Sequence, residues 1–110
     1  MVYEILHYLS PTGHNVFEEW LESLLDARTE ARIVARIARL EVGNFGDCKT
    51  IREGVCELRI DFGPGYRVYY AMAGRRVVLL LCGGDKGTQH HDIRRAVAYW
   101  NDFQKRTAQS

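Results

Sequence analysis

The feature that most constrains the fold is a pair of alternating apolar and polar runs around the turn Gly63-Pro64-Gly65. Both runs lie in the stretch VCELRIDFGPGYRVYYAMAGRRVVLLLCGGDK, residues 55–86, which ends with a third and more apolar run. Alternation is typical of half-buried β-strands, and glycine and proline supply the backbone angles that a chain reversal needs. The stretch therefore predicts three consecutive antiparallel strands, of which the third is covered on both faces.

The alternation also predicts which charged side chains meet. Because strand side chains alternate with period 2, the register that buries both apolar sets brings Arg59 and Arg67 together on the other, exposed face. Tyr69 has the same parity as Arg67, and Lys86 follows the third strand. We therefore predict an anion site formed by three cations beside an exposed tyrosine. An ordinary solvated face, on which Arg59 pairs with Asp61, is the alternative.

The remaining elements follow from capping residues and apolar spacing. The predicted elements are a strand over residues 2–8, helices capped by Asn15, Asp26 and Thr88, and a loop over residues 45–54 before the three strands. The order is strand, helix, helix, three strands, helix, in a single domain of residues 1–110. This order indicates an α+β fold, with a mainly antiparallel twisted sheet packed on a helical hairpin.

Four arginines recur along the predicted second helix. They are Arg28, Arg32, Arg36 and Arg39. Such a stripe is usually a solvated face that makes (i, i+4) pairs, here with Glu30 and its neighbours. A role in binding nucleic acid or a partner is the alternative.

Composition narrows the class of protein. The apolar and charged fractions, 46% and 26%, are ordinary for a soluble globular chain with a net charge of +1. Residues 1–48 carry a net charge of −4, whereas residues 49–110 carry +5. A basic second half suits a polar face that meets phosphates, although chance clustering produces similar imbalances.

The cysteines and the N-terminal residues indicate the compartment. Cys48, Cys56 and Cys82 are odd in number and lack a chelating spacing, which predicts reduced thiols and neither a metal site nor a cofactor. The first residues include Glu4 and His7 and lack an apolar core, so no signal peptide is expected. No apolar run is long enough to span a membrane. We expect a cytoplasmic protein.

Three segments of the chain resemble a known toxin family. ELRIDFGPGYRVYY and VVLLLCGGDKGTQHHDIRRAVAYW resemble the RelE/ParE superfamily of type II toxins, and FEEWLESLLDARTEARIVARIARLEVGNFGD resembles its HigB-like, phage-derived addiction module killer branch. The resemblance covers roughly residues 3–103. It implies a RelE-like fold and a ribosome-dependent mRNA endonuclease that inhibits translation. It also implies a cognate antitoxin, typically a helix-turn-helix DNA-binding protein, as a protein partner.

The resemblance assigns cleavage to positions that correspond to Arg59, Arg67 and Lys86. Metal-independent RNA cleavage uses the 2′-hydroxyl as nucleophile and needs a base, an acid and cations that stabilise the transition state. Guanidinium groups suit the phosphate oxygens because they are planar, bidentate donors. Lys86 can stabilise charge or, with a depressed pKa, exchange a proton. Tyr69 can stack on an unpaired base, a contact worth about 1–3 kcal/mol.

The general acid and base are less well defined. His90 and His91 have a suitable intrinsic pKa, but neighbours on a helix differ by about 100°, so at most one faces the site. Alternatively, both are exposed residues at the start of a helix. The candidate substrate-binding residues besides Tyr69 are Lys49, Arg52, Asp85 and Gln89. Asp85 can instead orient Lys86 or cap the helix.

Two other functions are compatible with the same family resemblance. A ParE-like protein poisons DNA gyrase and needs no catalytic residues. A decayed toxin would only bind its antitoxin and co-regulate their operon. Fold alone does not choose among these functions.

Overall fold

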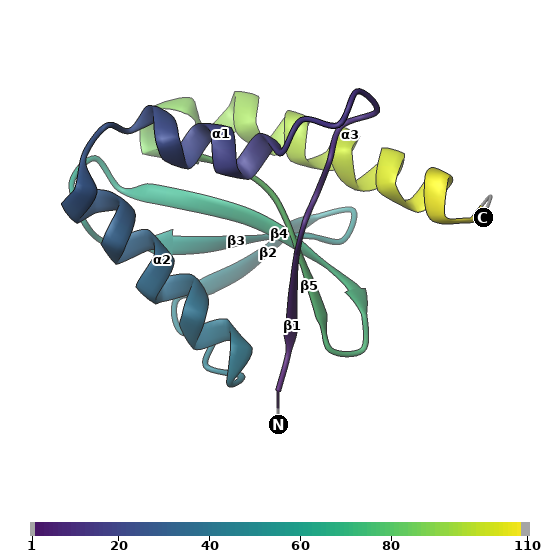
Figure 1. The fold of residues 1–110 in the computed structure, drawn as a ribbon, viewed down its shortest axis with the longest axis horizontal. Coiled ribbons are helices and arrows are strands. Elements are labelled where there is room, and N and C mark those ends of the chain that lie inside the picture. Colours follow the sequence, from purple (N-terminus) through teal and green to yellow (C-terminus); the bar gives the residue numbers. More distant parts are fainter. Residues whose placement is uncertain (1, 109–110) are drawn as a thin grey trace.

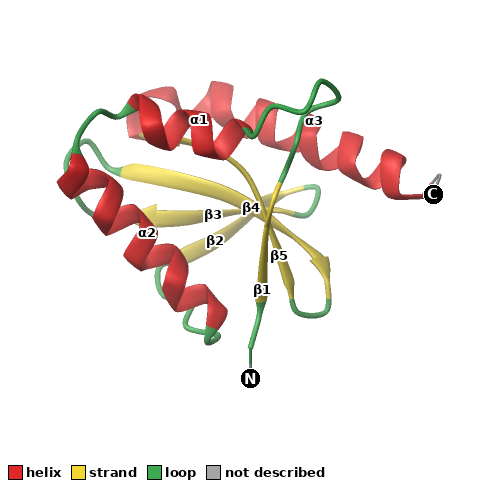
Figure 2. Cartoon of the chain, in the orientation of Figure 1, coloured by secondary structure: helices red, strands yellow, loops and turns green. Residues whose placement is uncertain are grey.

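The computed structural model describes residues 2–108 and contains a five-stranded sheet with helices packed on both faces (Figures 1 and 2). The strands are β1 (Glu4–His7), β2 (Cys48–Arg52), β3 (Val55–Ile60), β4 (Tyr66–Gly74) and β5 (Val77–Asp85). The helices are α1 (Val16–Ser23), α2 (Ala27–Glu41) and α3 (Gln89–Ala108), with a short 3-10 turn, Lys86–Thr88, before α3. This mixed α+β architecture agrees with the predicted class and is consistent with a RelE-like fold.

The sheet has the strand order β1-β5-β4-β3-β2. The pairs β2–β3, β3–β4 and β4–β5 are antiparallel, and β1 runs parallel to β5. The strands fan across one another in Figure 1, as expected for a twisted sheet. β5 lies inside the sheet and residues 78–82 are buried, which confirms the prediction from its apolar sequence.

β2 corrects the sequence prediction, which expected a loop over residues 45–54. The segment pairs with β3 at the edge of the sheet, with Lys49 opposite Glu57. Only Ile51 of its five side chains is partly buried. The side chains of this edge strand are mostly polar, so they show no apolar alternation. Polar side chains are common on edge strands because they discourage pairing with other chains. Pairing with β3, rather than its own side chains, makes it a strand.

The first two helices begin at the predicted caps. The Asn15 side chain accepts a hydrogen bond from the backbone N–H of Glu18 at 3.0 Å. The Asp26 carboxylate accepts one from the backbone N–H of Arg28 at 3.0 Å. These bonds satisfy N–H groups that have no partner inside the helix.

The start of the third helix differs from the prediction. Asp85 caps the 3-10 turn that precedes α3, and Thr88 is the last residue of that turn rather than the residue that begins the helical segment as a cap. The Asp85 carboxylate accepts a hydrogen bond from the N–H of Gly87 at 2.8 Å, and the Thr88 hydroxyl accepts one from the N–H of Asp85 at 3.2 Å. Of the roles left open for Asp85, the structure therefore shows the cap.

Two hydrophobic clusters lie on opposite faces of the sheet. Residues of α1 and α2 pack with Leu58, Val68 and Leu80 in the first cluster. Residues of α3 pack with Tyr69 and Leu79, among others, in the second. The face that the alternation suggested was solvent-exposed is therefore largely covered by α3.

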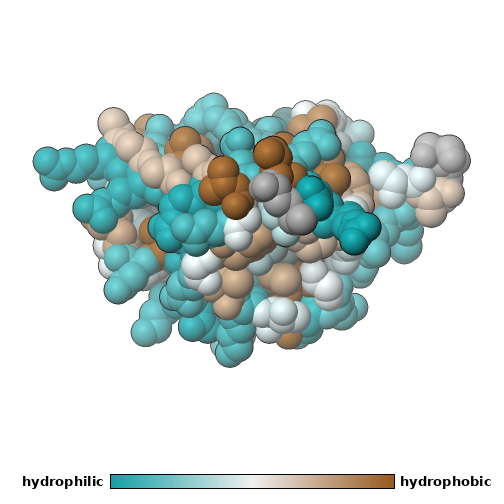
Figure 3. Space-filling view, turned by 90° about the horizontal axis from the view of Figure 1, so that it is seen from below, coloured by the Kyte–Doolittle hydropathy of each residue, from teal (hydrophilic) through white to brown (hydrophobic). Residues whose placement is uncertain are grey.

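The outer surface is mixed. The face seen in Figure 3 is largely hydrophilic, with small apolar patches near its centre. Within residues 2–108, no helix combines the length and the apolar character that crossing a membrane requires.

Replacing Gly84 with alanine is expected to destabilise the protein. A Cβ there would lie 1.8 Å from Asp92 Oδ2. The Asp92 carboxylate is held by the Thr88 hydroxyl at 2.5 Å and by Arg95 Nη2 at 2.9 Å, so it cannot move away without losing both bonds. We expect a loss of about 1–3 kcal/mol of unfolding free energy, the usual range for overpacking. Urea denaturation measures it.

Gly74→Ala is the matched control for this prediction. A Cβ at Gly74 would lie 3.4 Å from the nearest heavy atom, a methyl carbon of Val77, which is ordinary contact. Equal stabilities of the two variants would contradict the predicted clash at Asp92.

The thiols of Cys48 and Cys82 are expected to differ in reactivity. Cys48 is exposed, whereas Cys82 is buried. Burial raises the pKa of Cys82 to about 12, so its thiol stays protonated at neutral pH. An aromatic disulfide reagent should therefore label Cys48 in the native protein and reach Cys82 only after denaturation. Rapid native labelling of Cys82 would contradict its burial.

Candidate functional site

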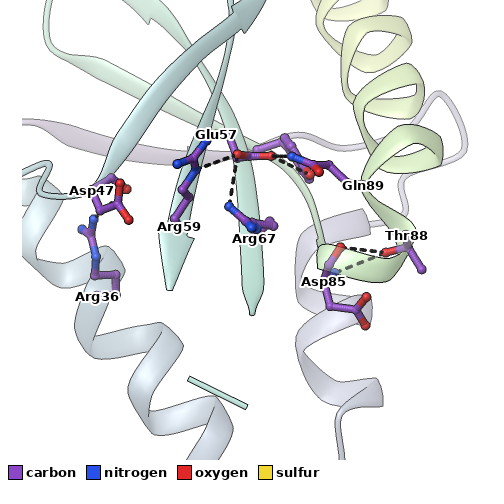
Figure 4. A network of polar contacts seen from close by, with 9 residues as sticks. Arg36, Asp47, Glu57, Arg59, Arg67, Asp85, Thr88 and Gln89 are labelled. Carbon is purple, nitrogen blue, oxygen red and sulfur yellow. Dashed lines mark hydrogen bonds and ion pairs between the residues drawn. The ribbon is translucent and has the colours of Figure 1, made fainter. Parts of the chain in front are cut away.

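Arg59 on β3 and Arg67 on β4 lie directly opposite each other in the antiparallel ladder, which agrees with the prediction that they share one face of the sheet. Like charges in such a pair repel, so the arrangement needs a counter-charge. Glu57 supplies it, since its Oε1 accepts hydrogen bonds from Arg59 Nε at 3.1 Å and from Arg67 Nη1 at 3.3 Å (Figure 4). The Arg59 side chain is 37% exposed and that of Arg67 is 13% exposed. Both guanidinium groups are thus held from behind by one carboxylate.

The Glu57 side chain is fully buried and uses both of its oxygens. Its Oε2 accepts hydrogen bonds from Gln89 Nε2 at 2.7 Å and from the Tyr69 hydroxyl at 3.1 Å. Burial by itself raises the pKa of Glu57, but the hydrogen bonds from Gln89, Arg59 and Tyr69 and the charge of Arg67 bring it below its ordinary value. Glu57 is therefore ionised at neutral pH and links β3, β4 and the start of α3.

Lys86 completes the predicted group of cations. A groove of about 460 Å³ is lined by Asp47, Arg59, Ile60, Asp61, Gly63, Pro64, Gly65, Arg67 and Lys86. The turn over residues 63–65 flanks the lysine, since a Cβ at Gly65 would lie 3.6 Å from the Lys86 Cβ. Arg59, Arg67 and Lys86 therefore share one open groove, as the alternation and the position after β5 predicted.

Tyr69 is not the exposed stacking platform that its parity suggested. Its side chain is fully buried in the cluster under α3, and its hydroxyl donates to Glu57. Burial and the neighbouring Glu57 charge raise its pKa, so it remains a neutral donor. The expectation of an exposed ring was wrong because alternation identifies a shared face but not whether a helix covers that face. Tyr69 supports Glu57 from within the core.

The histidines lie away from the three cations. His90 is exposed and lines a different groove, of about 340 Å³, together with Ile51, Arg52, Ile93 and Arg94. His91 is also exposed and lines neither groove. The structure therefore does not bring the two predicted proton-transfer residues to the groove of Arg59, Arg67 and Lys86.

The other predicted binding residues separate in the same way. Gln89 joins the network through Glu57, and Asp85 caps the turn that carries Lys86 (Figure 4). Lys49 is exposed on the edge strand β2, where it lies opposite Glu57 of β3. Arg52, at the end of the same strand, belongs to the groove of His90.

Sequence reasoning missed three residues of the site. Alternation places Glu57 on the same face as Arg59, but it predicts an exposed side chain there and gives no sign of a buried contact with both arginines. Asp47 and Asp61 line the groove as carboxylates that can accept a proton. The alternative of an ion pair between Arg59 and Asp61 is wrong, since no such pair forms among residues 2–108.

Arg36 corrects the prediction of a solvated arginine stripe on α2. Its side chain is only 8% exposed. Its Nη2 donates to the backbone carbonyl of Phe45 at 2.6 Å and to that of Asp47 at 3.3 Å. The loop that leads into β2 covers this arginine, which no pattern within the helix could reveal.

Chemically, the groove is suited to bind an anion. Two guanidinium groups and an ammonium group face it, and a buried carboxylate restricts how the guanidinium groups can turn. Planar, permanently charged donors held in this way match the oxygens of a phosphate diester. Among residues 2–108, no three or more His, Cys, Asp or Glu side chains are gathered so that they could share a metal ion.

Comparison with known proteins places the chain in a family. The family described as "Phage derived protein Gp49-like (DUF891)" matches residues 19–101. An uncharacterized protein of Haemophilus influenzae is 54% identical over 80 residues, which are 73% of this chain and 81% of that relative. Arg59, Arg67 and Lys86 all lie inside the matched segment. The chain therefore belongs to the Gp49-like family of phage-derived proteins, a type II toxin-like family related to RelE and HigB.

Proposed function

We propose that this protein is the toxin of a type II toxin–antitoxin system and that it cleaves mRNA without a metal ion. The observation that carries the proposal is the single groove in which Arg59, Arg67 and Lys86 meet. Membership of a RelE- and HigB-related family supports it. Within that family, the motifs around the two arginines favour the HigB-like addiction module killer branch.

The proposed reaction is a transesterification within the RNA. The 2′-oxygen attacks the adjacent phosphorus, the bond from phosphorus to the 5′-oxygen breaks, and a 2′,3′-cyclic phosphate and a 5′-hydroxyl result. One proton leaves the 2′-hydroxyl and one is delivered to the 5′-oxygen, so no further reactant is needed. Catalysis then depends on holding the phosphate, stabilising its extra charge and moving two protons.

The arginines are suited to the phosphate. Each guanidinium can donate to its oxygens, and Glu57 holds both against the repulsion between them. Because the hydrogen-bonded carboxylate limits their motion, little reorganisation is needed as charge develops on the phosphate. Glu57 is buried behind the arginines and acts as a positioning residue.

The groove also contains groups suited to proton transfer. Asp47 and Asp61 offer carboxylates that can accept the 2′-proton, and Lys86 offers an ammonium group that can donate to the 5′-oxygen. We propose these residues in place of His90 and His91, which line no part of this groove.

The family resemblance extends the proposal to the cell. We propose that the substrate is mRNA in the ribosomal A site and that the protein acts in the cytoplasm. We also propose that a cognate helix-turn-helix antitoxin, encoded by a neighbouring gene, neutralises it by covering or distorting the groove. Co-expression with that gene should restore growth and yield a complex. Failure of both would overturn the proposed partner.

The central test is expression of the protein in a translating extract, followed by mapping of RNA 5′ ends. Codon-associated cuts with 5′-hydroxyl ends are expected for the wild type. They should disappear in a variant that combines Arg59→Ala, Arg67→Ala and Lys86→Ala. Intact RNA together with inhibited gyrase supercoiling would instead favour ParE-like action. Harmless expression of the chain alone would favour a decayed toxin.

A further inference from the structure

A second groove adjoins the first on the side of α2. It measures about 410 Å³ and is lined by Arg32, Ala35, Arg36, Arg39, Asp47, Arg59, Ile60, Asp61 and Phe62. Four of these residues, Asp47, Arg59, Ile60 and Asp61, also line the groove of Lys86. In Figure 4, Arg36 and Asp47 lie on one side of Arg59 and Arg67 lies on the other. The two grooves therefore form one continuous surface with Arg59 on the shared wall.

The α2 wall of this second groove carries uncompensated positive charge. Arg32, Arg36 and Arg39 lie one turn apart on the same side of the helix. Within residues 2–108, none of the three forms an ion pair with a carboxylate. The groove also contains Arg59, whose charge Glu57 offsets together with that of Arg67, and the two carboxylates of Asp47 and Asp61, so the cations still outnumber the carboxylates. This excess of positive charge favours an anionic ligand.

Arg36 has hydrogen-bonding capacity that the fold does not use. Its side chain is more than nine-tenths buried, and its Nη1 is buried without a hydrogen-bond partner among the described residues. A buried donor without an acceptor is unfavourable and calls for an explanation, such as a bound ion or water that completes its hydrogen bonds; Arg67 Nε and Arg95 Nε are two further examples among the described residues. The guanidinium is also fixed in place, because Gly46 lies so close that a Cβ there would be 2.7 Å from Arg36 Nη2.

The same groove also has a flat surface. The Arg32 guanidinium lies over the Phe62 ring, with its Cζ 4.2 Å from the ring centroid. Guanidinium planes and aromatic rings are the surfaces on which proteins stack unpaired RNA bases. A nucleotide therefore finds both a cationic wall for its phosphate and a stacking surface for its base.

We propose that this second groove binds the nucleotide next to the scissile link, with its phosphate at Arg36 and Arg39 and its base against the Arg32 guanidinium that covers Phe62. The inference rests on the proposed function, because it requires RNA in the first groove. A single strand can follow the shared wall at Arg59 from one groove into the other. An acidic protein segment is the competing occupant.

The test is a double-mutant cycle that combines removal of one phosphate charge from the RNA with removal of one arginine from the protein. Synthetic mRNAs carry one neutral methylphosphonate at a time, at the two phosphates on each side of the cut, and cleavage is followed both on ribosomes and free in solution. Removing one flanking charge should raise the half-saturating toxin concentration of the wild type about tenfold, the usual effect of losing a charge-assisted hydrogen bond. Arg39→Ala alone should cause a similar rise. The two changes together should add nothing further, since they remove the same contact.

Two further variants control the cycle. Arg36→Lys keeps the charge but removes the planar fork, so it should show part of the same coupling. Arg28→Ala removes an exposed arginine of the same helix that lines neither groove. Any effect it has on the half-saturating concentration should therefore be additive with the effect of neutralising each phosphate. Thermal denaturation checks that each variant folds. Arg39 is exposed, so Arg39→Ala is expected to fold like the wild type.

The outcomes separate the two proposals. Independent, additive effects at all four phosphates, with normal cleavage by the wild type, would overturn the second subsite and leave the proposed function intact. Additive effects together with weakened antitoxin capture by Arg39→Ala would assign the groove to an acidic protein segment and also overturn it. Absence of cleavage by the wild type on both kinds of substrate would overturn the proposed function and the subsite together.

Discussion

Arg67→Ala is expected to slow RNA cleavage by about 100- to 1,000-fold, the effect of removing one preorganised donor from a developing oxyanion. The reason is that Arg67 is the more buried of the two paired arginines and is held by Glu57 at 3.3 Å. Arg67→Lys should recover only part of the rate, because an ammonium group is a point charge without the fork geometry. Single-turnover cleavage of an mRNA shown to be cut by the wild type measures both rates.

The control is Arg75→Ala, which removes an exposed arginine between β4 and β5. It should leave the rate unchanged. Thermal denaturation of each variant separates lost chemistry from lost folding. A rate for Arg67→Ala within about threefold of the wild type, in a folded protein, would remove Arg67 from the mechanism.

Glu57→Ala is expected to lower the unfolding free energy by about 3–5 kcal/mol, the range for breaking a buried ion pair by removing one partner. The change would leave Arg59, Arg67, Tyr69 and Gln89 without a shared acceptor. Glu57→Gln keeps the shape and one acceptor oxygen, so its loss should be smaller, about 1–3 kcal/mol. Urea denaturation measures both losses of unfolding free energy. The control is Glu53→Gln, at an exposed turn, which should leave the unfolding free energy unchanged.

The stability that Glu57 contributes should depend on pH. Its pKa is lowered in the folded protein from the ordinary value of 4.5. A carboxyl with a depressed folded pKa stabilises the protein above its unfolded pKa, and this contribution is lost as the pH falls through the folded value. The stability difference between wild type and Glu57→Gln should therefore be constant near neutrality and shrink below pH 4.5. A difference that persists undiminished in acid would contradict the depressed pKa.

Much of the fold was readable from local patterns. The alternation around residues 63–65 predicted β3, β4 and β5 and placed Arg59 and Arg67 on one face, because the side-chain period and the apolar pattern restrict the register of a hairpin. Asn15 and Asp26 predicted the starts of α1 and α2, since capping is a local interaction. β2 could not be predicted, because a polar edge strand is stabilised by its backbone pairing with the neighbouring strand and not by a pattern in its own side chains.

The site was predictable only in part. Register brought Arg59 and Arg67 together and the position after β5 indicated Lys86, but neither showed that Glu57 is buried and holds both arginines. His90 and Arg52 meet in a separate groove, and their spacing along the chain gave no indication of it. The helix pattern gives Arg36 the same exposed position as the other arginines of α2. The structure shows that the loop before β2 covers it.

The sequence by itself determined which side chains share a face, because that depends on the period of each element and on short turns. Only the tertiary structure decided which of those faces is covered, because burial results from packing between segments far apart in the chain. α3 closes over Glu57 and Tyr69 and changes a solvated row into a buried support for two arginines. For that reason the same residues that predicted an anion site could not predict what holds it in place.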